Sequence, residues 1–441
     1  AENLRQQSRL ELLMEQAIPL YVKSPSKSDG TAGRDRIGFG LSVLMLCLLP
    51  IERFVLPFRL TVADFALVLL TAYGLWKAWH THQQLCFPLL LPMWLILISS
   101  PVATLAGSAH LNSVMAIVQE IYLFAWFIVL TNLLRAFPFS DLDRLMKIWS
   151  AISCVEAVTI LLGMFRIGPS FFYTPPYESP DSFTGVVRGI GTYANSNAAG
   201  TYLFISIFVL LATSWPVWLR FTLGMWLLVG TIGTGSLGSL FSTLGSLAVL
   251  GVVIAITEDP HPTTLRGGIV GVGAGVVAAA LFALSLWPSS LPGVGLHKGG
   301  RLLELTFGRL PRALAGRLVL LNKGWSVYTL HPWGTGPNSS ALYAASLHND
   351  YVAFLFERGP LGGIGWLWMV GSTLFAPLQA ARQAIDSSQR WRVLVLGAGF
   401  LACAVNALSH EISHFRQVWV LMAFLFALSY ALSPPAGPMC Q

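Results

Sequence analysis

A first group of residues suited to binding an anion or a sugar lies between positions 188 and 200. Glycines at 189 and 191 let the backbone approach a ligand closely, and Asn195 or Asn197 can cap a helix that begins directly after them. The N-terminus of that helix, next to Arg188, would form a cradle for a phosphate or a sugar. A capped turn without a ligand fits the same residues. A dinucleotide-binding turn does not, because no predicted strand precedes the glycines.

A second candidate is Arg317, which lies in a predicted amphipathic helix. Pro311 suits the first position of a helix. Apolar residues then recur at helical spacing, at Leu314, Leu318, Leu321, Trp325 and Tyr328. Arg317 flanks this apolar face, so its planar guanidinium would lie at a lipid–water boundary and could hold two phosphate oxygens at once. An interfacial arginine that binds bulk lipid phosphate is the alternative.

The third candidate is His348, which is followed by Asn349 and Asp350 where the next apolar segment begins. An imidazole can take up a proton near neutral pH, as a general base for a sugar hydroxyl must. Asp350 could tune or orient that ring. His331 opens the turn-rich stretch His-Pro-Trp-Gly-Thr-Gly-Pro-Asn that comes shortly before. A histidine that only completes a helix end would fit the position of His348 equally well.

The elements that must position these residues are membrane helices. Of the 441 residues, 54% are hydrophobic and only 11% are charged, against roughly 25% charged residues in soluble domains. A chain so poor in charge keeps most of its surface out of water. The five cysteines are scattered, without a CxxC or metal-like spacing, so we expect neither disulfides nor a cysteine metal site.

The sequence predicts an all-α, polytopic membrane protein with about twelve spans. The apolar segments lie at 37–56, 60–79, 86–106, 113–134, 146–166, 197–214, 216–233, 235–257, 268–287, 358–378, 393–409 and 415–433. Basic residues in the short connections favour a cytoplasmic location for both termini. Segment 1–36 would then be a cytoplasmic N-terminal region, 37–166 a first set of membrane helices, and 434–441 a cytoplasmic tail.

With this topology, two long connections face outward, at 167–196 and 287–347. The second has six basic residues and one acidic residue, so it contributes +5 of the formal charge of +7. Its charged residues are Lys298, Arg301, Glu304, Arg309, Arg312, Arg317 and Lys323. Such a concentration suggests an anionic ligand or lipid headgroups. We expect membrane lipid, and no nucleic acid, among the partners.

In their order along the chain, these segments resemble one family. An Arg-Gly-x-Gly-Thr-Tyr-x-Asn-x-Asn segment at 188–197 opens a middle helix, and a Gly-Arg pair at 316–317 lies in the amphipathic helix. The stretches at 331–337 and 348–351 follow, and then Glu-Arg-Gly-Pro-Leu-Gly at 357–362. The pattern is similar to the bacterial O-antigen ligase and O-antigen polymerase family, which are membrane glycosyltransferases of the GT-C type. The specific match covers roughly residues 185–370, and the helical frame extends it so that 167–433 would form the catalytic membrane region.

The resemblance implies glycosyl transfer at the periplasmic face of the bacterial inner membrane, from a glycan linked to undecaprenyl diphosphate, without a metal or another cofactor. His348 would be the general base or would position the acceptor hydroxyl. Arg317, with Arg188, would neutralise the departing diphosphate. The further residues expected to bind substrate are Asn195, Asn197, Asn349, Asp350, Arg309, Arg312 and His331.

One difference from the family pattern helps to distinguish a polymerase from a ligase. Many members, ligases especially, carry Ser-Arg-Gly at the outer end of a middle helix, whereas this chain has Leu237 where that arginine would fall. Arg188, Arg309 or Arg312 could take its place. The departure favours a polymerase of O-antigen or exopolysaccharide repeat units, working with a chain-length regulator. A ligase that transfers glycan to lipid A-core or to a protein is the alternative.

A transporter or flippase with twelve spans is the alternative from another class. Such a protein would place ionisable residues at mid-membrane depth, facing a cavity. The sequence offers only Asp64, Glu120 and Glu156 well inside the predicted spans, while the basic residues gather outside them.

Overall fold

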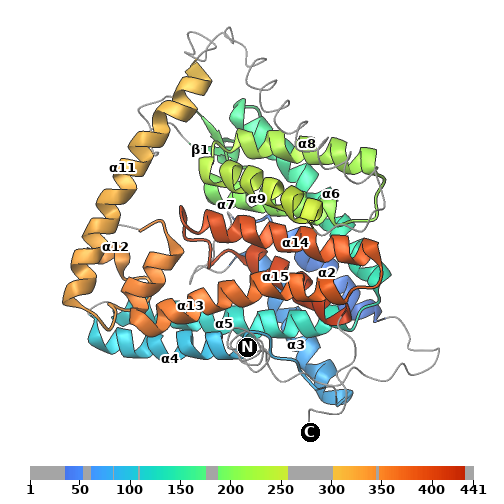
Figure 1. Cartoon of the computed structure of the whole chain (residues 1–441), viewed down its shortest axis with the longest axis horizontal. Coiled ribbons are helices and arrows are strands. Elements are labelled where there is room, and N and C mark those ends of the chain that lie inside the picture. The colour runs from blue at the N-terminus through green and yellow to red at the C-terminus, as the bar shows by residue number, and fades with distance from the viewer. Residues whose placement is uncertain are drawn as a thin grey trace, which may run out of the picture.

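The computed structural model describes residues 35–52, 61–82, 84–107, 110–174, 187–256, 301–343 and 347–432; the side chains at 254–256, 301–315, 341 and 343 lie outside this description. The described chain is almost entirely helical (Figure 1). Its helices are α2 (Arg36–Leu48), α3 (Val62–His80), α4 (Leu90–Ala106), α5 (His110–Arg135), α6 (Phe139–Met164), α7 (Ser196–Leu211), α8 (Val217–Gly233), α9 (Leu237–Ile256), α11 (Arg301–Leu330), α12 (Ser340–Tyr343), α13 (Asp350–Gln383), α14 (Ser387–Asn406) and α15 (Arg416–Leu432). A short 3-10 helix, η2 (Ser170–Phe172), precedes strand β1 (Tyr173–Thr174), which pairs antiparallel with β2 (Arg188–Gly189).

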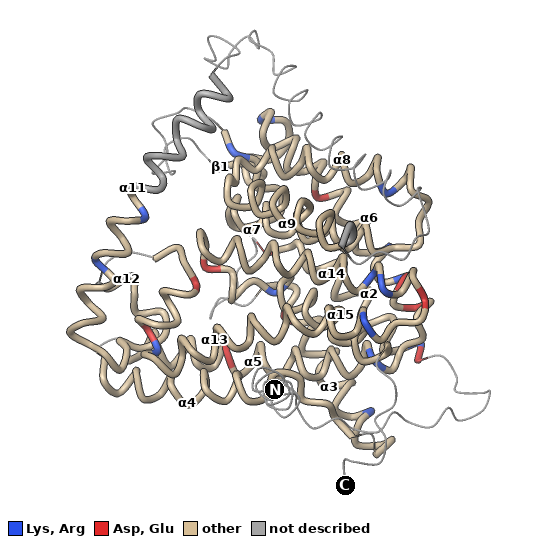
Figure 2. The backbone as a smooth tube through the Cα atoms, viewed as in Figure 1, with Lys and Arg blue, Asp and Glu red and all other residues tan. Residues whose placement is uncertain are grey.

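The long helices lie side by side as a bundle, and α11 runs across one end of it (Figure 1). We call this end the α11 end. Within the described residues, α7, α9, α13 and α15 all begin there. The densest group of charged residues lies at the opposite end (Figure 2). There Asp143 accepts a hydrogen bond from the Ser214 amide at 2.8 Å and pairs with Arg392 at 3.1 Å, which ties α6 and α14 to the turn before α8.

The length of the helices and their exposed apolar side chains are those expected of a helix bundle in a membrane. Helices α3, α5, α6 and α13 are long and apolar enough to cross one, and most of the remaining bundle helices are shorter and apolar. Large apolar side chains such as Trp79, Leu105 and Leu111 point outward from the bundle. A backbone in hydrocarbon must satisfy its hydrogen bonds within its own segment, which is why the chain forms helices here.

Eleven of the twelve predicted spans overlap a helix, although α2 ends at Leu48 within the predicted span 37–56, and the twelfth span, 268–287, lies outside the described residues. The number of membrane crossings therefore stays a prediction. Four starts differ clearly from expectation, and two of them are those of α6 and α14, which begin at Phe139 and Ser387 rather than at 146 and 393. Helix α13 begins at Asp350, before the predicted 358, because it runs through a break at Gly359 and Pro360. Helix α11 begins at Arg301 rather than at Pro311, since residues 301–310 are rich in good helix formers.

The core lies around α7 and α15, which are buried along almost their whole length. Trp149 of α6 packs between Tyr202 of α7 and Phe424 of α15, with ring centroids 6.2 and 6.0 Å away. Its indole N–H donates to the Ser206 hydroxyl at 2.9 Å. These two helices form the rigid support for the loops at the α11 end.

Ion pairs inside the bundle join helices that are distant in sequence. Arg416 of α15 binds Asp64 of α3 in a bidentate manner, at 2.7 and 2.6 Å, and the Tyr122 hydroxyl of α5 donates to the same carboxylate at 2.9 Å. Arg358 of α13 pairs with Glu120 of α5. Charges in apolar surroundings need such partners, because an unpaired charge is costly to bury.

We expect Arg416→Met to lower the free energy of unfolding by roughly 3–5 kcal/mol, because it leaves the Asp64 carboxylate buried without its partner. Adding Asp64→Leu should recover part of this loss. The measurement is unfolding in detergent, followed by tryptophan fluorescence. Lys147→Ala serves as the control, since the Lys147–Asp143 pair is more exposed and such pairs contribute at most about 1 kcal/mol. Equal losses in the single and double variants would contradict the expectation.

Candidate functional site

The candidate site lies at the α11 end, where helix N-termini and connecting loops meet. The loops before α7, α9, α13 and α15 all reach this end. Unpaired amide groups and the helix dipole make each N-terminus attractive to anions. Whether these N-termini together form one anion-binding site depends on the side chains that lie between them.

Arg188 is fixed against the turn between α8 and α9. Its Nε donates to the Thr234 carbonyl at 3.1 Å, and one Nη donates to the Gly235 carbonyl at 3.3 Å and to the Asn197 side-chain oxygen at 3.2 Å. Gly235 has φ +62°, and a Cβ there would come within 3.4 Å of the arginine side chain. The guanidinium therefore contacts the turn that immediately precedes Leu237.

The two asparagines predicted to cap α7 have different roles. The Asn195 side-chain oxygen accepts hydrogen bonds from the amides of Asn197 and Ala198, at 3.0 and 2.8 Å, so Asn195 is the cap. Asn197 lies in the first turn and accepts from Arg188. The predicted helix start is confirmed, and Asn197 connects it to Arg188.

His348 is exposed and has a left-handed backbone, with φ +49°. Its amide donates to Oε1 of Glu411, in the α14–α15 loop, at 3.1 Å. Asn349 caps α13 by accepting from the Val352 amide at 3.1 Å, and its amide group donates to the Leu408 carbonyl at 3.0 Å. His348 and Asn349 are therefore held by the same loop.

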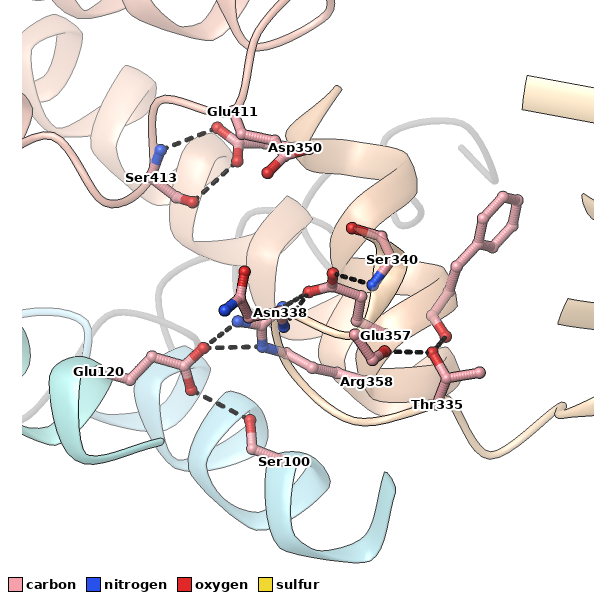
Figure 3. Close-up of polar contacts among 12 residues, drawn as sticks. Ser100, Glu120, Thr335, Asn338, Ser340, Asp350, Glu357, Arg358, Glu411 and Ser413 are labelled. Atoms are coloured by element: carbon pink, nitrogen blue, oxygen red, sulfur yellow. Dashed lines mark hydrogen bonds and ion pairs between the residues drawn. The ribbon is translucent and has the colours of Figure 1, made fainter. Parts of the chain in front are cut away.

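Asp350 has a structural role. It is 1% exposed, and its carboxylate accepts the amides of Ile412 and Ser413 and the Ser413 hydroxyl, at 2.8, 3.0 and 2.8 Å. Figure 3 shows the two contacts with Ser413. This carboxylate therefore fixes the α14–α15 loop. We had expected it to tune or orient the His348 ring, but these contacts are with Ile412 and Ser413 instead.

His410 lies among the predicted site residues. Its ring is nearly buried and stands 6.4 Å from the His348 ring, edge to face. Burial, together with the nearby side chains of Arg317, His348 and Arg188, lowers the pKa of His410 to about 3. A Cβ on Gly238, near the start of α9, would come within 3.0 Å of this ring. His410 is thus kept neutral, with Arg188, Arg317 and His348 near enough to contribute to this effect.

The remaining predicted residues lie elsewhere or outside the description. His331 directly follows α11, so it stands fourteen residues from Arg317, which is about 21 Å along a helix. Arg309 and Arg312 belong to α11, and their side chains lie outside the described residues. Arg317 itself is half-buried.

The stretch after His331 docks on the break in α13. Pro360 has no amide, and Gly359 leaves the helix with φ +70°, so carbonyls of the preceding turn lose their helical donors. The amide of Thr335 donates to the Phe356 carbonyl at 3.2 Å, and that of Gly336 to the Glu357 carbonyl at 2.8 Å.

The Glu357 side chain completes this docking. Its carboxylate accepts the amides of Asn338 and Ser340 at 2.9 and 3.2 Å, and Arg358 beside it pairs with Glu120 (Figure 3). The motif that precedes α12 therefore fixes the end of α11 to the bundle.

Two residues at the site were missed by the sequence analysis, His410 and Glu411. The available signal was the polar run Ser-His-Glu-Ile-Ser-His at 409–414 between two apolar segments. Across the described residues, no group of three or more His, Cys, Asp or Glu side chains is arranged to hold a metal ion. The chemistry that this arrangement offers is anion binding beside an exposed imidazole.

Comparison with known proteins adds no relative, since neither a family model nor a curated protein matches the chain.

His410 makes stability depend on pH in a defined direction. The unfolded chain binds a proton at this residue below about pH 6.5, whereas the folded chain resists it down to about pH 3. Stability should therefore fall with falling pH through this window, by about 1.4 kcal/mol per pH unit once the unfolded histidine is protonated. We expect His410→Asn to show a shallower loss of melting temperature between pH 6 and pH 5. The exposed His414, replaced by Asn, is the control; equal slopes in all three proteins would contradict the assignment.

Proposed function

We propose that the protein is a membrane glycosyltransferase that uses a glycan linked to undecaprenyl diphosphate, with its active site at the α11 end. The observation that supports the proposal is the exposed His348 ring 6.4 Å from the His410 ring, beside Arg188 at the N-terminus of α7, with Arg317 near enough to help lower the pKa of His410. Two guanidinium groups suit a diphosphate, and an exposed imidazole suits an acceptor hydroxyl. The outward orientation of this end rests on the charge of the short connections, and the periplasmic face of the inner membrane is what the sequence resemblance implies.

The reaction needs one bond to break and one to form. The bond between the anomeric carbon and the diphosphate oxygen breaks, and the diphosphate keeps the electron pair. The acceptor hydroxyl forms the new glycosidic bond and gives its proton to the neutral imidazole of His348. Arg188 and Arg317 stabilise the charge that develops on the diphosphate, for which one well-placed donor commonly contributes roughly 3 kcal/mol.

Polymerisation of O-antigen or exopolysaccharide repeat units is the main form of this proposal. Ligases of the resembling family carry arginine where this chain has Leu237, and here Arg188 reaches the same turn from β2. A ligase with lipid A-core or a protein as acceptor is the alternative. In both cases the donor would bind without a metal, through cationic side chains and amide groups.

A transporter is less well supported by the acids inside the bundle. Asp64 is bound by Arg416, and Glu120 by Arg358. Glu156 accepts the amide and the hydroxyl of Thr192, both at 2.8 Å. Fixed partners of this kind hold a carboxylate in place, whereas a transport pathway needs ionisable groups that face a cavity.

Substitution of His348 tests the proposal. His348→Ala should abolish long glycan chains in cells while the lipid-linked donor accumulates. His348→Gln should be nearly as inactive, because glutamine forms hydrogen bonds but takes no proton at neutral pH. Glycan length is measured by gel electrophoresis, and transfer with purified donor and acceptor.

The controls are His331→Ala and His414→Ala, since neither residue belongs to the group around His410. Near-normal activity of the glutamine variant would restrict His348 to positioning the acceptor. Full activity of the alanine variant in the purified assay would overturn the site and favour the transporter.

Arg317 should act through geometry as well as charge. We expect Arg317→Ala to abolish transfer without loss of expression, and Arg317→Lys to restore only a small part, because an ammonium group cannot form two parallel hydrogen bonds with a diphosphate. Lys323→Ala is the matched control, since Lys323 lies on the exposed face of the same helix. Full activity of the lysine variant would reduce Arg317 to a source of positive potential.

A further inference from the structure

His348 has a backbone conformation that a histidine seldom adopts. Its φ of +49° lies in the left-handed region, where the Cβ of an L-residue is crowded by the backbone. Such a conformation persists only when surrounding contacts enforce it, and it is found preferentially at functional sites. The direction of the imidazole depends on this conformation, because φ and ψ set the direction of the Cα–Cβ bond relative to the bundle.

The side chain of Glu411 contacts the backbone of His348 directly. Oε1 of Glu411 accepts the His348 amide at 3.1 Å across a sequence separation of 63 residues. The amide precedes the cap of α13, so no helical carbonyl is available to accept it. Glu411 supplies the acceptor from the α14–α15 loop.

The loop that carries Glu411 is itself fixed. Asp350 binds its residues Ile412 and Ser413, and the Asp350 amide donates to the Ala407 carbonyl at 2.9 Å. On the other side, Asn349 holds the Leu408 carbonyl. Glu411 therefore acts from a rigid support, and a change at this residue need not disturb the helices.

We propose that Glu411 is a positioning residue that holds His348 in its left-handed conformation and so directs the imidazole toward the acceptor. This inference rests on the proposed function for the role of His348. It assigns to Glu411 the acceptor atom Oε1 and not the negative charge, since the bond to a backbone amide needs only an oxygen lone pair. A glutamine in its place keeps such an oxygen at nearly the same position.

The test combines hydrogen exchange with kinetics on the full-length protein in detergent. Mass spectrometry follows deuterium uptake at the His348 amide, in peptides that cover 347–350. In Glu411→Ala this amide should exchange faster than in the wild type, and kcat should fall about tenfold or more, as expected when a reacting group is misplaced. The KM for the donor should stay within about twofold, because the diphosphate contacts are unchanged.

Glu411→Gln should restore both the protection of the amide and most of kcat, and His414→Ala should leave both unchanged. Unchanged exchange or unchanged kcat in the alanine variant would overturn the proposal. A glutamine variant with a protected amide but the kcat of the alanine variant would also overturn it, since the charge would then be essential. The exchange measurement is independent of activity. If the His348 amide exchanges faster in Glu411→Ala but the wild-type protein transfers no glycan, the proposed function is wrong. The contact by which Glu411 positions His348 would still be supported.

Discussion

The candidate site depends on the buried carboxylate of Asp350 more than on any other group. It begins α13 and at the same time accepts three donors from residues 412–413. This joins the start of one helix to the loop between two others. His348, Asn349, His410 and Glu411 all lie within three residues of one of these two segments, so their relative positions follow from this contact. In apolar surroundings, a fully bonded carboxylate of this kind gives a rigid junction.

The break in α13 makes a second junction possible. A straight helix would use its own amides and would offer nothing to the stretch after α11. Because Gly359 and Pro360 interrupt the ladder, the carbonyls of Phe356 and Glu357 accept amides from Thr335 and Gly336 instead. The end of α11 is attached at this point, and with it the helix that carries Arg317. A local irregularity thus determines where a remote cation lies.

The helices were predictable from the sequence because long apolar segments leave few alternatives in a membrane. The cap at Asn195 was predictable from local chemistry, since an asparagine before an apolar helix has a direct structural meaning. The start of α11 was not, because Pro311 is also a valid first residue and was given more weight than the helix-forming residues at 301–310. Local rules describe helix ends well when the ends coincide with a change in composition.

It was harder to predict which residues belong to the candidate site than to predict that a site lies at this end of the bundle. Arg188, Arg317 and His348 were singled out by residue type and spacing and then by the resemblance of their motifs, and in the structure all three lie near enough to His410 to lower its pKa. His410 and Glu411 are recognisable only from contacts across more than sixty residues. Asp350 was noticed for its proximity to His348 in the sequence, yet its carboxylate points to residues 412–413. Which way a side chain faces is a tertiary property that a single sequence does not encode locally.

The contacts of Arg188 have an entropic consequence. An arginine that is free in solution loses rotamer freedom when it binds a ligand, at a cost of up to about 2 kcal/mol. Here the side chain is already immobilised by Thr234, Gly235 and Asn197, so that cost belongs to folding and is not repeated at each binding event. A fixed cation also cannot follow a ligand of a different shape. The turn between α8 and α9 would therefore discriminate by the spacing of charges in the ligand, in addition to attracting negative charge.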